Sequence, residues 1–404
     1  MTVVDFILEN IDKTTKLNDE KSGEDTLIVL PYPFTTPCVE GMFQEMYYWD
    51  TYFTQKALYL TGRNAQALHN VKNFVFLLER YGKIPNGNRT YYLKNSQPPF
   101  FGLMLKDLME NAPNAITVEY AFEKLEKEYS FWMKNRQVKN GLNHYNRDME
   151  DEANPDTIRW YKERTGIELE NTADNCRSIW SEGESGWDFC PRFHSACTHY
   201  NAIDLNCLLY ADELLLSLWA KQAGDIQAFK RYQNAAVKRK ETMWKHMRGK
   251  DGIWYDYNYD ENTLSKVISC ASLFPFFVGL DTDTSAFEKT IAVLERAFGV
   301  VASQSERKTY QWAEPNGWAP LNYIAVAAAE RLGLKETALR LAEKYLVAME
   351  GIFEKTGRLW EKYNAETGDM SVTSEYGTPE MLGWTAGVYM ALYHYRKNGY
   401  QKLI

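Results

Sequence analysis

The stretch YYWDTYFTQKALYLTGRNAQALHNVKNFVFLLERYG, Tyr47 to Gly82, predicts the fold of this chain. Apolar and aromatic residues recur every three to four positions over Tyr47–Leu60, and Gly62 follows the pattern. The pattern resumes over about Asn64–Tyr81 and again ends at a glycine. This spacing is typical of amphipathic helices closed by a glycine. The stretch is therefore predicted to form two helices joined by a short turn.

The same helical period continues along most of the 404 residues. Further helices are predicted over Pro98–Met109, Ile116–Lys134, Ile203–Ala223, Ile226–His246, Ser285–Phe298, Leu321–Arg331, Lys335–Phe353 and Met381–Arg396. Helix pairs recur at similar intervals, and no Pro/Ser-rich linker divides the chain. We therefore expect a mainly α protein, with residues 1–404 forming a single toroid of about a dozen paired helices.

Long segments rich in Gly, Pro, Asn and aromatic residues separate these helices. They are predicted as loops over Tyr32–Met46, Lys83–Pro99, Asn143–Asp156, Asn171–His199, Arg307–Pro320 and Trp360–Pro379. Connections of this length are unusual in a compact domain, and long ordered loops commonly carry function. We also expect a hairpin at GIWYDYNYD, Gly252–Asp260.

Charge and composition limit the classes of partner. The net charge is −8 and Lys and Arg form no stripe, so a nucleic-acid partner is not expected. No apolar run reaches transmembrane length, so no membrane partner is expected. The 12 Trp, 27 Tyr and 19 Phe favour a carbohydrate ligand, because aromatic faces stack on the C–H faces of sugar rings. Composition does not determine the oligomeric state.

The six cysteines and six histidines predict neither disulfides nor a metal site. No CxxC pair occurs, and the N-terminal segment has no basic, apolar secretory pattern, so we expect reduced thiols and a cytoplasmic location. His194 and His199 lie near Cys197, but no zinc-ligand spacing follows. We expect these side chains to pack in the core or lie on the surface, and we expect no cofactor.

One carboxylate lies between aromatic residues in ESGWDFCPRF, Glu184–Phe193. Asp188 follows a Gly-Trp pair and precedes a Phe. An apolar surround can raise the pKa of a carboxyl group, which a general acid needs at neutral pH. Asp188 is therefore a candidate acid for glycoside hydrolysis. The alternative is an Asp that caps the N-terminus of a helix or turn before PRF.

Glycoside hydrolysis needs a second carboxylate, which activates water or attacks the sugar. Glu361 in WEKYN and Glu375 in SEYGTPE are the candidates in the last long loop. The alternative for each is a solvated loop position or an ion pair with a neighbouring lysine. The residues themselves do not decide between these interpretations.

Other loops carry side chains suited to sugar hydroxyls and ring faces. They comprise Trp49 and Asp50 in MYYWDTYF, Asn86, Asn88, Arg89, Asn95 and Gln97 in IPNGNRTYYLKNSQPPFF, and Gln311, Trp312 and Trp318 in YQWAEPNGWAP. The alternative is that these residues only form turns, since PNGN is a favourable turn sequence and QPP ends a loop.

Taken together, these loops resemble the trehalase family (glycoside hydrolase family 37), the inverting α-glycoside hydrolases with an (α/α)6 barrel. GMFQEMYYWDTYF and YQWAEPNGWAP resemble the two family signatures, and IPNGNRTYYLKNSQPPFF, ESGWDFCPRF, EKYN and GWTAGV resemble further family stretches. The resemblance runs in the family's order from about Pro33 to Tyr389. It implies an (α/α)6 barrel and an inverting α-glycosidase acting on a small sugar without a cofactor or metal.

The resemblance also implies roles for matching residues. Asp188 matches the general acid, and Glu361 matches the general base that activates water. Sugar-binding roles are implied for Phe43, Trp49, Asp50, Asn86, Gln97, Gly186 and Glu375, while Gln311, Trp312 and Trp318 are sugar-binding candidates because of the side chains in their loop.

Several positions depart from the family pattern. The family has arginines that help to hold the two glucose units of trehalose. At the matching positions this chain has Met42, Asn95 and, in a loose alignment, a residue near Asn154. The Asp of the second signature falls at Ala313, and the glycine run before the closing EY is shortened. Neither Met nor Asn reproduces the rigid donor fork of Arg. Compensation from elsewhere would have to come from Arg89, Arg159, Arg177 or Arg192.

Three functions are consistent with this sequence. The first is an inverting α-glycoside hydrolase that cleaves trehalose or a related small α-glucoside. The second keeps this chemistry on a glycoside with another leaving group, such as a glyceryl or glycerate glucoside. The third is a non-catalytic sugar-binding protein, which the presence of both Asp188 and Glu361 disfavours.

Overall fold

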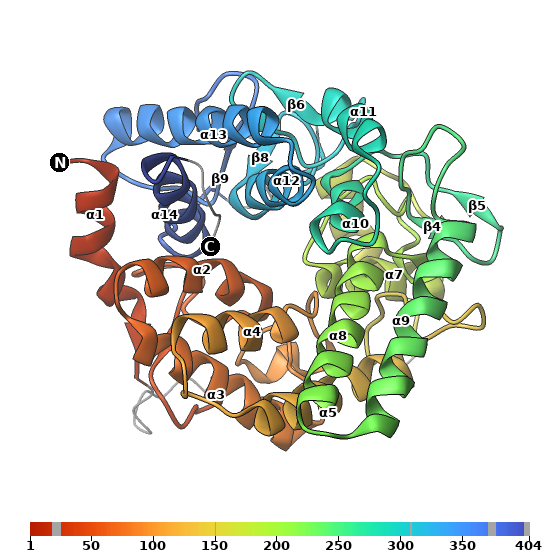
Figure 1. Cartoon of the computed structure of the whole chain (residues 1–404). Coiled ribbons are helices and arrows are strands. Elements are labelled where there is room, and N and C mark those ends of the chain that lie inside the picture. The colour runs from red at the N-terminus through yellow and green to blue at the C-terminus, as the bar shows by residue number, and fades with distance from the viewer. Residues whose placement is uncertain (18–25, 150, 308, 371–376, 400–404) are drawn as a thin grey trace.

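Residues 1–17, 26–149, 151–307, 309–370 and 377–399 are described in the computed structural model, and in this part helices form a closed ring (Figure 1). Six helices make the inner circle: α2 (Tyr48–Leu60), α4 (Phe101–Asn111), α8 (Ile203–Gln222), α10 (Phe274–Phe277), α12 (Ala319–Arg331) and α14 (Gly383–Lys397). Each contacts the next, and α14 contacts α2 to close the circle.

An outer set of helices covers the inner circle. It consists of α1 (Val3–Asn10), α3 (Asn64–Tyr81), α5 (Val118–Asn135), α9 (Ile226–His246), α11 (Thr284–Leu294) and α13 (Lys335–Thr356). The sequence explains the division. Helix α2 buries residues around its whole circumference, whereas α3 buries one stripe and leaves the opposite face partly exposed. The predicted mainly α toroid, an (α/α)6 barrel, is confirmed.

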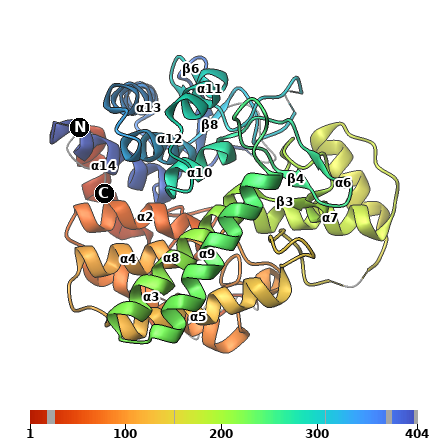
Figure 2. The ribbon, with the colours of Figure 1, turned by 45° about the vertical axis from the view of Figure 1, so that its right-hand side comes forward.

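A glycine allows the two ends of the ring to meet. At Gly387 on α14, an added Cβ would lie 2.0 Å from the carbonyl oxygen of Phe53 on α2. The two helix backbones therefore pack directly against each other, which no larger residue at this position would permit. Helices α1 and α14, from opposite ends of the chain, lie on the same side of the ring (Figures 1 and 2).

The strands are short and belong to the connecting loops. They are β1 (Thr15–Lys16) with β2 (Phe34–Thr35), β3 (Tyr200–Asn201) with β4 (Tyr257–Asn258) and β5 (Thr263–Leu264), β6 (Glu295–Arg296) with β7 (Gly299–Val300), and β8 (Asn316–Trp318) with β9 (Lys362–Asn364). The expected hairpin near Gly252–Asp260 is present as β4 and β5. In the β8–β9 pair, Trp318 lies opposite Lys362, which joins two of the predicted functional loops.

Four helices of the described residues, α1, α6, α7 and α10, were not predicted from the sequence. Helix α7 (Ala173–Ser185) occupies the first half of the predicted loop Asn171–His199, so the loop prediction was wrong there, and α6 (Pro155–Thr165) precedes α7. The sequence of α7 is polar and contains Ser and Gly, which suggests a loop. Its helix is nevertheless capped by Thr172 and buries Cys176 and Ile179, so tertiary packing outweighs weak local propensity. Figure 2 shows α6 and α7 together at one edge of the molecule.

The predicted helix Ser285–Phe298 also ends early. Helix α11 stops at Leu294, because Glu295 and Arg296 turn into β6 and pair with Gly299 and Val300. Within the described residues, no helix combines the length and apolarity needed to cross a membrane.

Candidate active site

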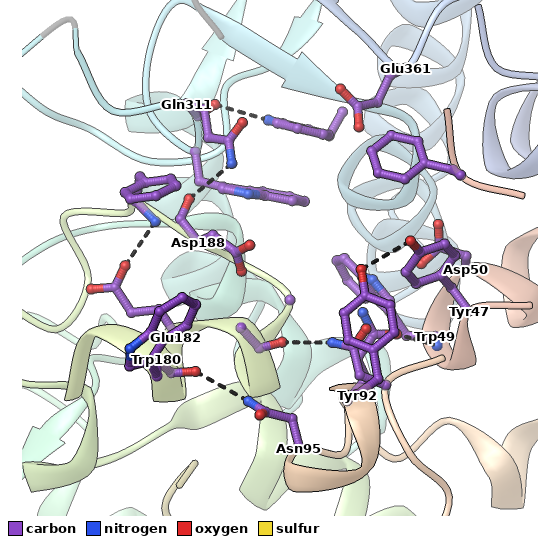
Figure 3. A pocket seen from close by; sticks show the side chains of 18 of the residues that line it. Tyr47, Trp49, Asp50, Tyr92, Asn95, Trp180, Glu182, Asp188, Gln311 and Glu361 are labelled. Atoms are coloured by element: carbon purple, nitrogen blue, oxygen red, sulfur yellow. Dashed lines mark hydrogen bonds between the residues drawn. The ribbon is translucent and has the colours of Figure 1, made fainter. Parts of the chain in front are cut away.

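A cavity of about 300 Å³ gathers the predicted site residues from loops far apart in the sequence (Figure 3). Its lining includes Phe43, Trp49, Asp50, Asn86, Gln97, Gly186, Asp188, Gln311, Trp312, Trp318 and Glu361. The remaining predicted residue, Glu375, lies outside the described residues. This volume is at the lower end of the range for small-molecule sites, so the cavity suits a small glycoside.

Asp188 lies three residues beyond Ser185, the last residue of α7. The helix ends at Gly186, which adopts the left-handed conformation (φ 72°). Asp188 is partly buried, and its carbonyl accepts a hydrogen bond of 3.2 Å from Gln311 Nε2. Asp188 does not cap the N-terminus of a helix, because it follows α7 and the next helical turn starts only at Cys197.

Glu361 lies on the other side of the cavity, immediately before β9. Its side chain is 3% exposed, and its Oε2 lies 3.2 Å from Nζ of the buried Lys362. The ion pair considered as an alternative for Glu361 is therefore present, yet the same carboxylate also lines the cavity.

Gln311 connects the two sides. Its Nε2 donates to the carbonyl of Asp188, and its Oε1 accepts a hydrogen bond of 3.3 Å from Lys362 Nζ. Its backbone carbonyl also accepts from the indole of Trp318. One buried amide thus fixes the loop of Asp188 relative to the strand that follows Glu361.

Stacked indoles form one wall of the cavity. Trp312 stacks on Trp318 with ring centroids 3.8 Å apart and on Trp187 at 5.1 Å. Trp384 packs edge-on against Trp318 of this stack and against Trp49, and Trp49 packs tilted against Trp312. These rings are all buried, so they present a rigid apolar face of the kind that binds a sugar ring.

Gly186 is required by this aromatic wall. An added Cβ would lie 3.0 Å from the indole of Trp49, closer than ordinary van der Waals contact. Its positive φ also favours glycine. The family-matched glycine therefore has a packing role here, since it lets α7 end directly against Trp49.

The amides Asn86 and Gln97 hold the neighbouring loops in place. Asn86 Nδ2 donates to the carbonyl of Gly183 on α7, and Gln97 Oε1 accepts from the backbone N–H of Trp49. Asn88, by contrast, is fully buried and bonds the backbone of Met46 and Ile28, so it is a structural residue.

Burial changes the protonation of two carboxyl groups in the cavity. Desolvation, together with the charge of Glu361, raises the pKa of Asp50 to about 8. Desolvation and the nearby Asp188 also raise the pKa of Glu182 to about 8, against hydrogen bonds from the backbone N–H groups of Phe189 and Cys190. Both groups are therefore mainly neutral at pH 7 and can donate a hydrogen bond to a hydroxyl.

Sequence reasoning missed several lining residues: Tyr47, Tyr92, Arg147, Trp160, Ile179, Trp180, Glu182, Phe189, Met381 and Trp384. Trp160, Trp180 and Glu182 were missed because α6 and α7 were not predicted, so nothing indicated which of their faces meets the site. Four of the missed residues lie inside quoted stretches, and those motifs were the available signal for them: Tyr47, Tyr92, Phe189 and Trp384.

The positions that depart from the family pattern differ in their surroundings. Met42 is 41% exposed and does not line the cavity. Asn95 does line it, and its Oδ1 accepts a hydrogen bond of 2.8 Å from Arg147 Nη1. Ala313 is buried in an apolar cluster with Phe189, and Asn154 caps the N-terminus of α6.

The four arginines considered as substitutes are paired elsewhere. Their partners are Glu45 for Arg89, Asp156 for Arg159, Asp151 for Arg177, and Asp204 with Asp256 for Arg192. None of the four is among the residues that line the cavity, whereas Arg147 is.

The described part of the chain contains no group of three His, Cys, Asp or Glu side chains arranged to hold a metal ion. His194 bonds the carbonyl of Ser265, and His199 contacts Asp174 and Asp260. All six cysteines are buried free thiols.

Comparison with known proteins gives a consistent result. The model of the trehalase family matches residues 3–396. The periplasmic trehalase of Xanthomonas axonopodis pv. citri is 32% identical over 415 residues, which cover 95% of this chain and 72% of that one. The neutral trehalase of Saccharomyces cerevisiae has a similar structure, with a TM-score of 0.75 and 25% identity, covering 98% of this chain and 80% of that one.

A more distant match shows a common fold. A mannosylglycerate hydrolase of glycoside hydrolase family 63 from Thermus thermophilus superposes with a TM-score of 0.62 at 14% identity, covering 89% of this chain and 95% of that one.

Proposed function

The chain belongs to the trehalase family of glycoside hydrolases, and on this premise we propose that it cleaves trehalose or a related small α-glucoside with inversion, using Asp188 as acid and Glu361 as base. The observation that carries the proposal is the placement of these two carboxyl groups on opposite sides of one small, aromatic-lined cavity (Figure 3). An inverting glycosidase needs this arrangement, since a water must fit between the base and the sugar.

The proposed reaction proceeds in one displacement. Asp188 donates its proton to the glycosidic oxygen as the bond from that oxygen to the anomeric carbon breaks. Glu361 accepts a proton from a water molecule, whose oxygen attacks the anomeric carbon from the opposite face. An α-glucoside therefore yields β-glucose and the free alcohol of the leaving group. The indole wall and the neutral Asp50 serve to orient the glucose ring.

Proton NMR followed in real time tests this proposal. The purified protein is mixed with trehalose and, separately, with a panel of other small α-glucosides. An inverting trehalase releases one α- and one β-glucose from trehalose before mutarotation. Release of β-glucose from another α-glucoside alone would keep the catalytic assignment and change the substrate. An untouched panel would favour a sugar-binding protein instead.

We further propose that the protein works in the cytoplasm. The six buried free thiols support this location, because reducing compartments keep cysteines in that state. Cell fractionation with an antibody against the protein tests it, and recovery in a secreted or periplasmic fraction would contradict it.

A further inference from the structure

The side of the cavity that receives the leaving group follows from the proposed function. The acid protonates the leaving oxygen, so the leaving group lies on the side of Asp188 and away from Glu361. In Figure 3, Asn95, Trp180 and Glu182 lie on that side, whereas Tyr47, Trp49 and Asp50 lie across the cavity. The leaving-group side is therefore formed largely by α7 and the loop that contains Asn95.

Two indoles form a shelf on this side. Trp160 on α6 and Trp180 on α7 stack with ring centroids 5.1 Å apart and an interplanar angle of 18°. Trp180 Nε1 donates to Thr157 Oγ1, which fixes the ring, and the Trp180 side chain remains 36% exposed. A rigid, partly exposed aromatic surface of this kind packs against the C–H groups of a bound organic molecule.

Arg147 lies at the edge of this shelf. Its guanidinium stands 5.1 Å from the ring of Trp180 and donates a hydrogen bond of 2.8 Å to the neutral Oδ1 of Asn95. Asn95 is held in turn by its own bond to the carbonyl of Trp180. Shelf, amide and guanidinium are therefore tied together into one preformed subsite.

The positive charge of Arg147 is not matched by a carboxylate in the described part of the chain. The acidic groups around it have other partners: Glu184 pairs with Arg136, Asp148 with Lys83 and Arg136, and Asp151 with Arg177. Burial lowers the pKa of Arg147, which reflects a charge removed from water without full compensation. Among the described residues that line the cavity, Arg147 is also the one cation.

Within the described residues, the partly buried guanidinium of Arg147 donates its side-chain hydrogen bond to an amide oxygen, which suits it to bind an anion. Its planar fork matches carboxylate and phosphate oxygens, and such charge-assisted bonds are stronger than those to neutral hydroxyls. We propose that Arg147 binds an anionic group on the leaving group, a carboxylate or a phosphate, while the Trp160–Trp180 shelf packs against its carbon skeleton. The preferred substrates are then small α-glucosides with an acidic leaving group, an inference that rests on the proposed function.

Two matched pairs of substrates test the proposal. Glucosylglycerate and glucosylglycerol differ by a carboxylate in place of a hydroxymethyl group, and trehalose 6-phosphate and trehalose differ by a phosphate. We expect kcat/KM to be ~10–100-fold higher for the anionic member of one pair, as one charge-assisted contact would give. The pair that shows the preference distinguishes carboxylate from phosphate.

Substitutions assign the preference to Arg147. Arg147→Gln should abolish the preference for the anionic substrate, mainly by raising the KM of that substrate, with a smaller change in the KM of the neutral one. Arg147→Lys should keep part of it. Arg159→Gln, on the exposed surface of α6, is the matched control and should leave the preference unchanged.

Equal kcat/KM within both pairs would overturn the proposal and leave the proposed function intact. A preference that survives Arg147→Gln would also overturn it. If no glucoside is hydrolysed, the proposed function fails. Calorimetric binding of the four compounds to the Asp188→Asn variant then still tests whether Arg147 binds an anionic group. Anion-selective binding lost in the Asp188→Asn, Arg147→Gln double variant supports the subsite, and charge-independent binding contradicts it.

Discussion

At the scale of single residues, the proposed acid and base are set in different surroundings. Asp188 is partly buried at the end of a helix, and its loop is held by the side chain of Gln311. Glu361 is almost fully buried and pairs with Lys362. Substitution of each group should therefore affect turnover in the same way and stability differently.

For turnover, Asp188→Asn and Glu361→Gln should each lower kcat by ~10²–10⁴-fold, since positioned acid–base groups contribute about this much. Glu361→Gln should also lower the melting temperature, because it removes the negative charge of the buried Glu361–Lys362 ion pair. Asp188→Asn should leave the melting temperature close to that of the wild type. Product formation measured by NMR and thermal denaturation followed by circular dichroism check both effects. Full activity of either variant would refute its assigned role.

Gly186 provides a second prediction at this scale. Gly186→Ala should destabilise the protein by ~1–3 kcal/mol and lower kcat, because the methyl group must displace Trp49 next to the loop of Asp188. Gly166→Ala is the matched control. It ends α6 with a similar φ of 70° but meets nothing within 4 Å of an added Cβ. Urea denaturation of both variants separates the cost of backbone strain from that of the contact, and equal losses would show that the contact with Trp49 is unimportant.

At the scale of elements, α7 is stabilised by a carboxyl group that is neutral when buried. Glu182 accepts hydrogen bonds from the backbone of the turn that follows Asp188 and from Tyr161 on α6. Glu182 thereby joins α6, α7 and the loop that contains Asp188. The same burial makes this junction sensitive to alkaline pH.

The sign of that sensitivity follows from the raised pKa of Glu182. The folded protein holds this proton up to about pH 8, whereas the unfolded chain releases it near the ordinary value of 4.5. The contribution of protonated Glu182 to the free energy of unfolding is fully present below pH 4.5 and is lost as the pH rises through about 8. Glu182→Gln, which mimics the protonated form, should flatten the fall in melting temperature between pH 5 and pH 9, a window set by the two pKa values.

Glu168 is exposed, and the variant Glu168→Gln serves as the control for this experiment. Its hydrogen bond with Lys162 lowers the pKa of Glu168, so it releases its proton below the alkaline range. The control should therefore retain the wild-type decline in melting temperature. An identical decline for Glu182→Gln would show that Glu182 is ionised when buried.

At the scale of the whole molecule, the ring closes where α14 packs on α2. The first elements of the chain are thereby joined to the last, and Trp49 on α2 is brought against Trp384 on α14 in the aromatic wall. Closure and the site thus depend on the same contact.

Gly387→Ala tests this dependence. Because its Cβ would overlap the carbonyl of Phe53, we expect a loss of stability of ~3 kcal/mol or more, with loss of activity. Gly351→Ala on α13 is the matched control, since nothing lies within 4 Å of its added Cβ. Gly351→Ala should leave the free energy of unfolding unchanged or raise it by ~0.5–1 kcal/mol, because alanine favours a helix more than glycine does. Chemical denaturation compares the two, and a harmless Gly387→Ala would contradict the close packing of α2 and α14.

The sequence by itself determined the ring and most of the proposed site. Apolar residues at helical spacing, as in Tyr47–Leu60 and Asn64–Tyr81, are a local signal, and the structure places these helices within a residue or two of their predicted bounds. The quoted loop motifs likewise located about half of the residues that line the cavity, among them Trp49, Asp188 and Glu361.

The tertiary structure decided what lies on the leaving-group side. Helix α7 is stable because buried contacts outweigh its weak local propensity, and such contacts cannot be read from neighbouring residues. The position of Arg147 beside Asn95 and Trp180 depends on three segments that meet only in the folded ring. Local periodicity therefore specified the scaffold, while the charge of the subsite arose from contacts between distant segments.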